Sequence, residues 1–151
     1  MQMLAICVSS ILVAIAFAHA LWGLRIWWPV RDELALARTV VGAPRIDRMP
    51  SCSACLTVTL ALLVVSVLNL VLGGVISTPW LPDTLVAIAG YGAAVVFLLR
   101  GFVGYLPFWA RITPEQPFRT YDKWAYSPLC ILLGLGILAL AQSFRASGFL
   151  V

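Results

Sequence analysis

Four long apolar stretches are the feature that most constrains the fold of this chain. They cover residues 3–28, 53–77, 84–105 and 127–144. A helix of about 20 apolar residues is long enough to cross the hydrocarbon core of a bilayer, and each stretch is of that order. The sequence therefore predicts an all-α, integral membrane four-helix bundle, formed by residues 1–151 as a single transmembrane domain.

The composition excludes a soluble globular domain. Hydrophobic residues make up 62% of the chain and charged residues 11%, whereas a globular domain is nearer half apolar and a quarter charged. The formal net charge is +4, but the basic residues form no continuous stripe that would follow a phosphate backbone. We therefore expect the lipid bilayer as a partner of this chain, and no nucleic acid.

The basic residues are divided unevenly among the three connections. Nine of the ten lie in or beside the first and third connections, whereas the second connection, residues 78–83, has no Lys or Arg. Basic loops remain on the cytoplasmic side of a membrane. We therefore expect the loops 29–52 and 106–126 to be cytoplasmic and both termini to lie on the opposite side. The nine residues are Arg25, Arg31, Arg38, Arg45, Arg48, Arg100, Arg111, Arg119 and Lys123.

Both basic loops carry apolar residues that should hold them against the membrane. In the first loop, an acidic first turn followed by apolar residues at helical spacing predicts a short amphipathic interfacial helix over residues 30–41. The third connection alternates prolines with aromatic residues, which predicts an aromatic-rich cytoplasmic loop that packs under the bundle as a lid. Its aromatic residues include Phe108, Trp109, Phe118, Tyr121 and Trp124. Within the spans, small residues such as Gly101, Gly104 and Gly134 predict close helix packing.

Four residues are expected to form a polar cluster within the membrane: His19, Arg100, Asp122 and Tyr126. His19 is the only histidine and lies about 14 Å along the first helix from Pro29. Ionisable groups at such depth are costly unless they find partners or water. We expect Arg100 to bond Asp122 and His19 to line a pocket above them. The alternatives are a structural clasp and a binding site.

Cys52 and Cys55 have the spacing of a redox pair. Four-helix thiol oxidases that pass electrons to quinone carry such pairs, which gives a membrane enzyme hypothesis its basis. Against it, the pair falls on the predicted cytoplasmic side, where thiols are normally kept reduced. The other cysteines, Cys7 and Cys130, lie in different spans and form no second pair. No spacing resembles a zinc motif, so we expect no metal and no cofactor.

Three motifs resemble a known family. They are His19-Ala-Leu-Trp22, then Arg100-Gly-Phe-Val-Gly104-Tyr105, and finally a segment from Phe118 through Asp122 to Tyr126-Ser-Pro-Leu-Cys130. Their order is similar to that in the small bacterial membrane proteins of domain-of-unknown-function family 3995. The resemblance implies a four-span protein of the bacterial inner membrane. Together with the distribution of basic residues, this places both termini in the periplasm. It implies no assigned activity and supplies no catalytic residues.

The sequence contains no complete catalytic set, so a non-catalytic role is the leading expectation. The chain is predicted to be an accessory subunit of a larger membrane assembly or a binder of an apolar small molecule or lipid. The alternative is a membrane thiol-redox or quinone-linked enzyme that uses Cys52 and Cys55. A membrane protein partner or a homo-oligomer would fit the accessory role.

Overall fold

The computed structural model describes residues 1–148, and within this range every regular element is helical. The predicted all-α fold is therefore confirmed. Four helices are long and apolar enough to cross a membrane; the fourth runs without a break from Phe118 to Ala146. The elements are α1 (Gln2–Gly23), α2 (Glu33–Val40), α3 (Cys52–Leu72), α4 (Asp83–Val103), α5 (Pro107–Ile112), α6 (Phe118–Tyr121), the π-helical turn η1 (Asp122–Tyr126) and α7 (Ser127–Gly148).

The first two long helices end before the apolar stretches from which they were predicted. The first stretch, 3–28, ends as a helix at Gly23, because Arg25 adopts a left-handed conformation with φ of 62°. The indole of Trp22 then donates a hydrogen bond to the carbonyl oxygen of Trp28 at 2.9 Å and folds the chain back. The second stretch, 53–77, ends at Leu72 before a turn. The third and fourth helices follow the predicted ranges 84–105 and 127–144 more closely, although α7 extends to Gly148.

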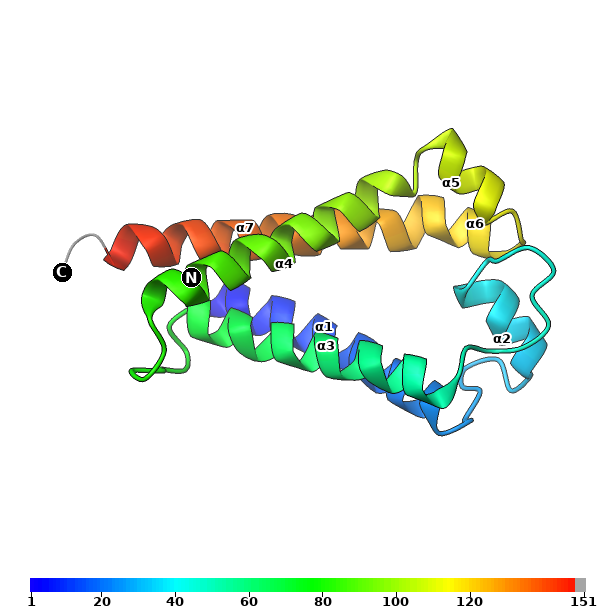
Figure 1. Cartoon of the computed structure of the whole chain (residues 1–151), viewed down its shortest axis with the longest axis horizontal. Helices are drawn as coiled ribbons and strands as arrows, with labels where there is room; N and C mark the ends of the chain where they lie inside the picture. Colours follow the sequence, from blue (N-terminus) through cyan, green and yellow to red (C-terminus); the bar gives the residue numbers. More distant parts are fainter. Residues whose placement is uncertain (149–151) are drawn as a thin grey trace.

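The four long helices are arranged as two antiparallel hairpins. Figure 1 shows α1 beside α3 and α4 beside α7, and most contacts between helices lie within these two pairs. Glycines allow the close approach in each pair. A Cβ atom on Gly101 of α4 would lie 2.9 Å from the backbone oxygen of Ser127 in α7. A Cβ atom on Gly73, just after α3, would overlap Ala5 of α1.

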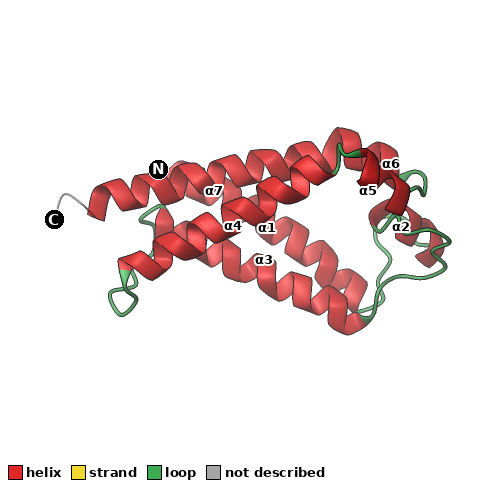
Figure 2. Ribbon diagram, turned by 45° about the horizontal axis from the view of Figure 1, so that its top comes forward, coloured by secondary structure: helices red, strands yellow, loops and turns green. Residues whose placement is uncertain are grey.

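The two hairpins share a core at one end and diverge toward the other. One buried cluster joins all four helices near the chain termini, and a second continues it through Leu12, Ala94 and Leu133. We call the end near the termini the narrow end and the opposite end the wide end; Figures 1 and 2 show the helices spreading toward the latter. The first cluster consists of Ala5, Val71, Leu72, Val86, Leu140 and Ala141.

The wide end is closed by α2, α5 and α6, which together we call the floor. Helix α2 begins after Asp32, whose carboxylate accepts a hydrogen bond from the Ala35 backbone N–H at 2.7 Å. Its buried residues pack against Trp22 and Trp27 of the first hairpin, and α2 also contacts α6. Helices α5 and α6 belong to the second hairpin. The predicted helix over 30–41 is thus present with shorter bounds, and much of the predicted aromatic loop is itself helical.

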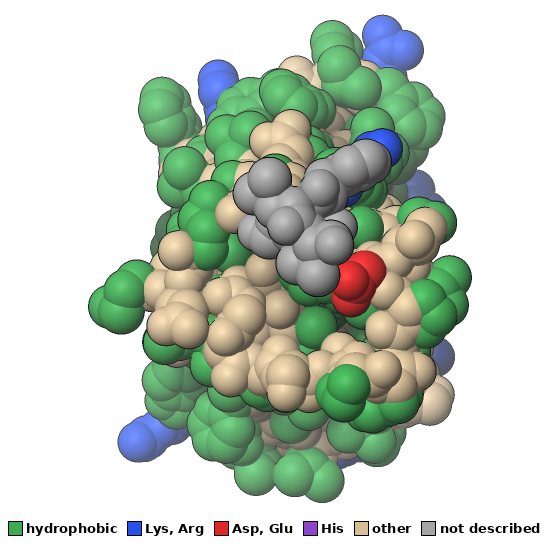
Figure 3. Space-filling view, turned by 90° about the vertical axis from the view of Figure 1, so that its left-hand side faces the viewer, with side chains coloured by type: hydrophobic (Ala, Val, Ile, Leu, Met, Phe, Trp, Pro, Cys, Tyr) green, Lys and Arg blue, Asp and Glu red, His purple; other side chains and the backbone are tan. Residues whose placement is uncertain are grey.

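Large apolar side chains are exposed along all four long helices. Examples are Phe17, Leu60, Val96 and Leu132, each more than 60% exposed. Figure 3, which looks onto the narrow end, shows mostly hydrophobic side chains and uncharged surface. Soluble proteins rarely leave apolar surface of this extent in water, so the four helices form a multi-pass membrane protein.

Candidate functional site

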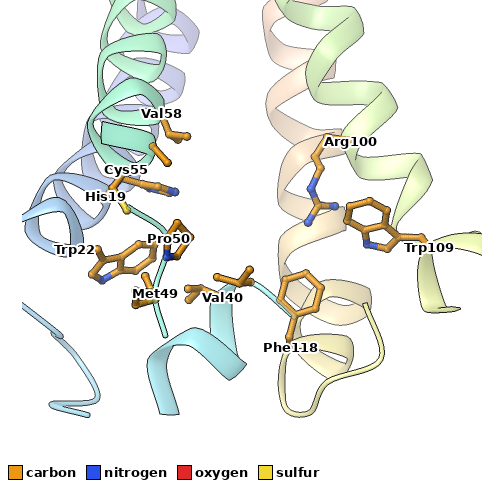
Figure 4. A pocket seen from close by; sticks show the side chains of 12 residues that line it. His19, Trp22, Val40, Met49, Pro50, Cys55, Val58, Arg100, Trp109 and Phe118 are labelled. Carbon is orange, nitrogen blue, oxygen red and sulfur yellow. The ribbon is translucent and has the colours of Figure 1, made fainter. Parts of the chain in front are cut away.

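A cavity of about 310 Å³ lies between the two hairpins at the wide end, above the floor. Figure 4 shows side chains reaching into it from both hairpins and from the floor. His19 and Arg100 are the only residues in its lining whose side chains are basic. The other lining residues are Trp22, Val40, Val41, Met49, Pro50, Ala54, Cys55, Val58, Trp109 and Phe118.

On the side of the second hairpin, Asp122 is fully buried and accepts four hydrogen bonds. One carboxylate oxygen, Oδ1, accepts from Arg100 Nη2 at 2.7 Å and from Ser127 Oγ at 3.3 Å. The other, Oδ2, accepts from the Trp109 indole at 2.8 Å and from Arg119 Nη1 at 3.4 Å. A buried carboxylate persists only when its charge and lone pairs are satisfied in this way.

The local backbone explains why Asp122 and Ser127 meet. In the π-helical turn η1, the Ser127 backbone N–H donates to the carbonyl oxygen of Asp122, five residues earlier. This wider turn also places the Ser127 hydroxyl against the Asp122 carboxylate. Gly104 leaves the space for both, because a Cβ atom there would overlap Ser127 Oγ and lie 3.2 Å from Asp122 Oδ2. Single π-helical turns of this kind often occur at functional sites.

Two guanidinium groups share the single carboxylate of Asp122. Arg119 Nη1 also donates to the carbonyl oxygen of Gly104 at 2.8 Å. The Arg100 guanidinium lies over the Trp109 ring, 5.4 Å from its centroid. Its Nη1 atom is buried and has no hydrogen-bond partner among the described residues. This wall of the cavity therefore carries one positive charge more than its carboxylate neutralises.

On the opposite wall, His19 contacts its own helix. Its Nδ1 atom lies 2.9 Å from the carbonyl oxygen of Ile15. Because a carbonyl oxygen only accepts, Nδ1 carries the proton in this contact and Nε2 is left for other partners. The ring packs against Trp22, with 4.8 Å between the ring centroids.

The four residues of the predicted polar cluster are brought together only in part. Arg100 and Asp122 form the expected ion pair, and His19 lines the same cavity from across it. Tyr126 turns to the floor instead, where its hydroxyl donates to the carbonyl oxygen of Thr39 at 3.2 Å. The sequence did not predict three further members of this site, Trp109, Arg119 and Ser127. Only Arg119 had a readable signal, because it precedes Asp122 by one helical turn.

The two cysteines of the predicted redox pair have different surroundings. Both are free thiols at the start of α3, but Cys52 is exposed, whereas Cys55 is only 4% exposed and lines the cavity. Within residues 1–148 no group of three His, Cys, Asp or Glu side chains is placed to hold a metal ion. Cys52 and Cys55 are not joined by a disulfide, and the redox hypothesis stays a prediction about these two residues.

We expect the two thiols to differ strongly in labelling. In native membranes, a water-soluble maleimide should label Cys55→Ser, which retains exposed Cys52, much faster than Cys52→Ser, which retains buried Cys55. Access of reagent to the sulfur controls such reactions. Because both variants retain Cys7 and Cys130, the label is measured by mass spectrometry on the peptide that contains residues 52 and 55. Equal labelling of the two variants would contradict this placement. A pair found reduced under all growth conditions would remove the redox hypothesis.

The sequence matches one protein family. The family model described as "Protein of unknown function (DUF3995)" matches residues 12–137, which is more than half of the chain. The matched range includes both walls of the cavity and the floor. Neither a curated protein nor a solved structure matches the chain.

Proposed function

Because this chain belongs to the DUF3995 family of proteins of unknown function, we propose its function from the cavity itself: it binds an apolar small molecule or lipid between its two hairpins. The observation that carries this proposal is the apolar lining of a cavity that borders the membrane-spanning helices. No catalytic step is required, and the role is that of a non-catalytic binder.

The size of the cavity limits what it accepts. Pockets for small molecules usually measure about 300–1,000 Å³, and this cavity, at about 310 Å³, is at the lower limit of that range. A whole phospholipid is too large for such a volume. A ring system, a head group or the first part of an acyl chain fits, with the rest of the molecule outside the cavity.

Filling the cavity should remove the bound molecule. Val58 of α3 lines the cavity, so in Val58→Trp the indole occupies the space that a ligand needs. The protein is extracted from its own membranes in mild detergent and measured by native mass spectrometry. We expect the wild type to retain a small-molecule adduct and Val58→Trp to lose most of it.

The matched control is Val67→Trp on the same helix. Val67 is 53% exposed and is not part of the cavity lining, so this variant should retain the adduct. An adduct of equal abundance in Val58→Trp, or none in the wild type, would refute the binding proposal. Copurification of the wild type with a stoichiometric membrane protein would instead favour the accessory-subunit alternative.

The proposed location is the bacterial inner membrane, with the floor in the cytoplasm and both termini in the periplasm. Support comes from the basic residues, because nine of the ten lie in or beside the two connections that build the floor. Such residues favour the cytoplasmic side and meet anionic headgroups there.

Reporter fusions test this orientation. Alkaline phosphatase is active only outside the cytoplasm, so it should be active when fused after Val151 or within residues 78–83. Fused within residues 30–50, it should be inactive. High activity from fusions at 30–50 would show that the orientation is the opposite of the one proposed, and it would not affect the description of the fold.

A further inference from the structure

Building on the proposed binding function, we infer that the ligand is an anionic amphiphile. Its oxyanion head group pairs with Arg100, and its apolar chain runs from the cavity toward the bilayer. Carboxylate and phosphate head groups share this chemistry. Three observations carry the inference: unsatisfied donors on Arg100, an uncompensated positive charge on one wall, and an apolar remainder of the cavity.

Most N–H donors of the Arg100 guanidinium have no acceptor among the described residues. Of its five N–H donors, the described residues accept only one hydrogen bond, from Nη2 to Asp122. The Nη1 atom is buried without a partner, while about a third of the side chain, 34%, remains exposed and borders the cavity. Unsatisfied buried donors cost free energy. An oxyanion in the cavity accepts from the guanidinium edge that Asp122 leaves free.

The charge balance selects an anion over a neutral acceptor. Arg100 and Arg119 both pair with Asp122, which leaves a net single positive charge at the wall. Within residues 1–148, no acidic residue is part of the cavity lining; Glu33 accepts from the Met49 backbone and Glu115 from the Arg45 backbone. A ligand with one negative charge neutralises the wall. Arginine is well suited to this contact because its planar fork matches carboxylate and phosphate oxygens.

The remaining lining selects an amphiphile over a water-soluble anion. Cys55 and Val58 from α3 face Arg100 across the cavity (Figure 4), and Phe118 covers its base. Ala54 of α3 is also part of the lining. These groups offer an inorganic anion nothing to replace its hydration shell. They suit the first methylene groups of an acyl chain. The free Nε2 atom of His19 lies on the same apolar side.

The test compares ligands that differ only in charge. The full chain in nonionic detergent is titrated with palmitate and with hexadecanol, and binding is followed by native mass spectrometry. We expect palmitate to bind at least about tenfold more tightly, since hydrogen bonds to charged groups are the stronger ones. A second pair, phosphatidylglycerol and phosphatidylcholine, shows whether a free fatty acid or an anionic phospholipid is the better source of the head group.

Matched variants locate the effect. Arg100→Gln should lose the preference for palmitate, whereas Arg145→Gln, which removes an exposed arginine outside this cavity, should keep it. Equal binding of palmitate and hexadecanol by the wild type overturns the inference even if Arg100→Gln fails to fold. If palmitate and hexadecanol bind equally and Val58→Trp abolishes the binding of both, the cavity binds apolar molecules without distinguishing their charge. If neither binds, or Val58→Trp changes nothing, the proposed function fails as well.

Discussion

Replacing Asp122 by alanine is expected to destabilise the protein more than any other single substitution at the cavity. The change leaves Arg100, Arg119 and the Trp109 indole without the carboxylate that accepts their hydrogen bonds. Breaking a buried ion pair from one side costs about 3–5 kcal/mol; here the partly exposed guanidinium groups of Arg100 and Arg119 would lose their counter-charge. The midpoint of thermal unfolding in detergent measures the loss.

Two further variants show that the effect belongs to the buried pair. Asp47→Ala removes an exposed carboxylate from the first connection and should leave the midpoint unchanged. Arg100→Ala should lower it by less than Asp122→Ala, because Asp122 keeps Trp109, Arg119 and Ser127 as donors. Equal midpoints for the wild type and Asp122→Ala would contradict a structural role of this carboxylate.

The second large effect is expected from Gly101→Ala in α4. The added Cβ atom would lie 2.9 Å from the backbone oxygen of Ser127, 3.0 Å from the backbone nitrogen of Ile131 and 2.5 Å from its side chain. Backbone atoms of a packed helix do not move aside singly, so α4 and α7 must separate along their contact. Overpacking of this kind costs about 1–3 kcal/mol. Thermal unfolding in detergent again provides the measurement.

Gly92→Ala is the matched control on the same helix. A Cβ atom at Gly92 meets no atom within 4 Å, and alanine is the better helix former by about 1 kcal/mol. This variant should therefore be as stable as the wild type or more stable. If Gly92→Ala lost as much stability as Gly101→Ala, the close contact between α4 and α7 would not be the cause.

The sequence predicted the existence of the helices better than their ends. Apolar runs of sufficient length identify a spanning helix, and all four were found. However, the apolar residues after Gly23 continue the run through a turn that begins at Arg25. Near a membrane surface, an apolar side chain can lie on a helix or on a turn. Composition therefore does not mark the helix end there.

The pairing of the helices into two hairpins was not predictable. In a membrane, the side of a helix facing lipid is as apolar as the side facing another helix. Small residues such as Gly101 and Gly134 indicated close packing, but not which helix would occupy the space. The cavity depends on that pairing, because it lies where the two hairpins separate.

Charged members of the site were predictable and neutral ones were not. An arginine within a spanning helix needs an acidic partner, and Asp122 was the best candidate for Arg100 because it precedes the fourth span on the same side of the membrane. Trp109 carries no charge to be neutralised, so nothing in the sequence revealed its bond to the carboxylate. Tyr126 was expected beside that pair, but its hydroxyl reaches a backbone oxygen in α2. A phenol hydroxyl donates to a backbone oxygen as readily as to a side-chain oxygen, so the residue type alone did not identify its partner.

The division into hairpins also divides the chain at its midpoint. Helices α1 and α3 lie in the first half of the chain and α4 and α7 in the second, and the backbone passes from one half to the other through the short turn between α3 and α4. Most helix contacts lie inside a half. We therefore expect each half to form most of its helix contacts by itself, whereas the shared core and the cavity need both halves. A chain cut within residues 78–82 would yield two fragments able to reassemble in trans, with the cavity re-formed only when both are present.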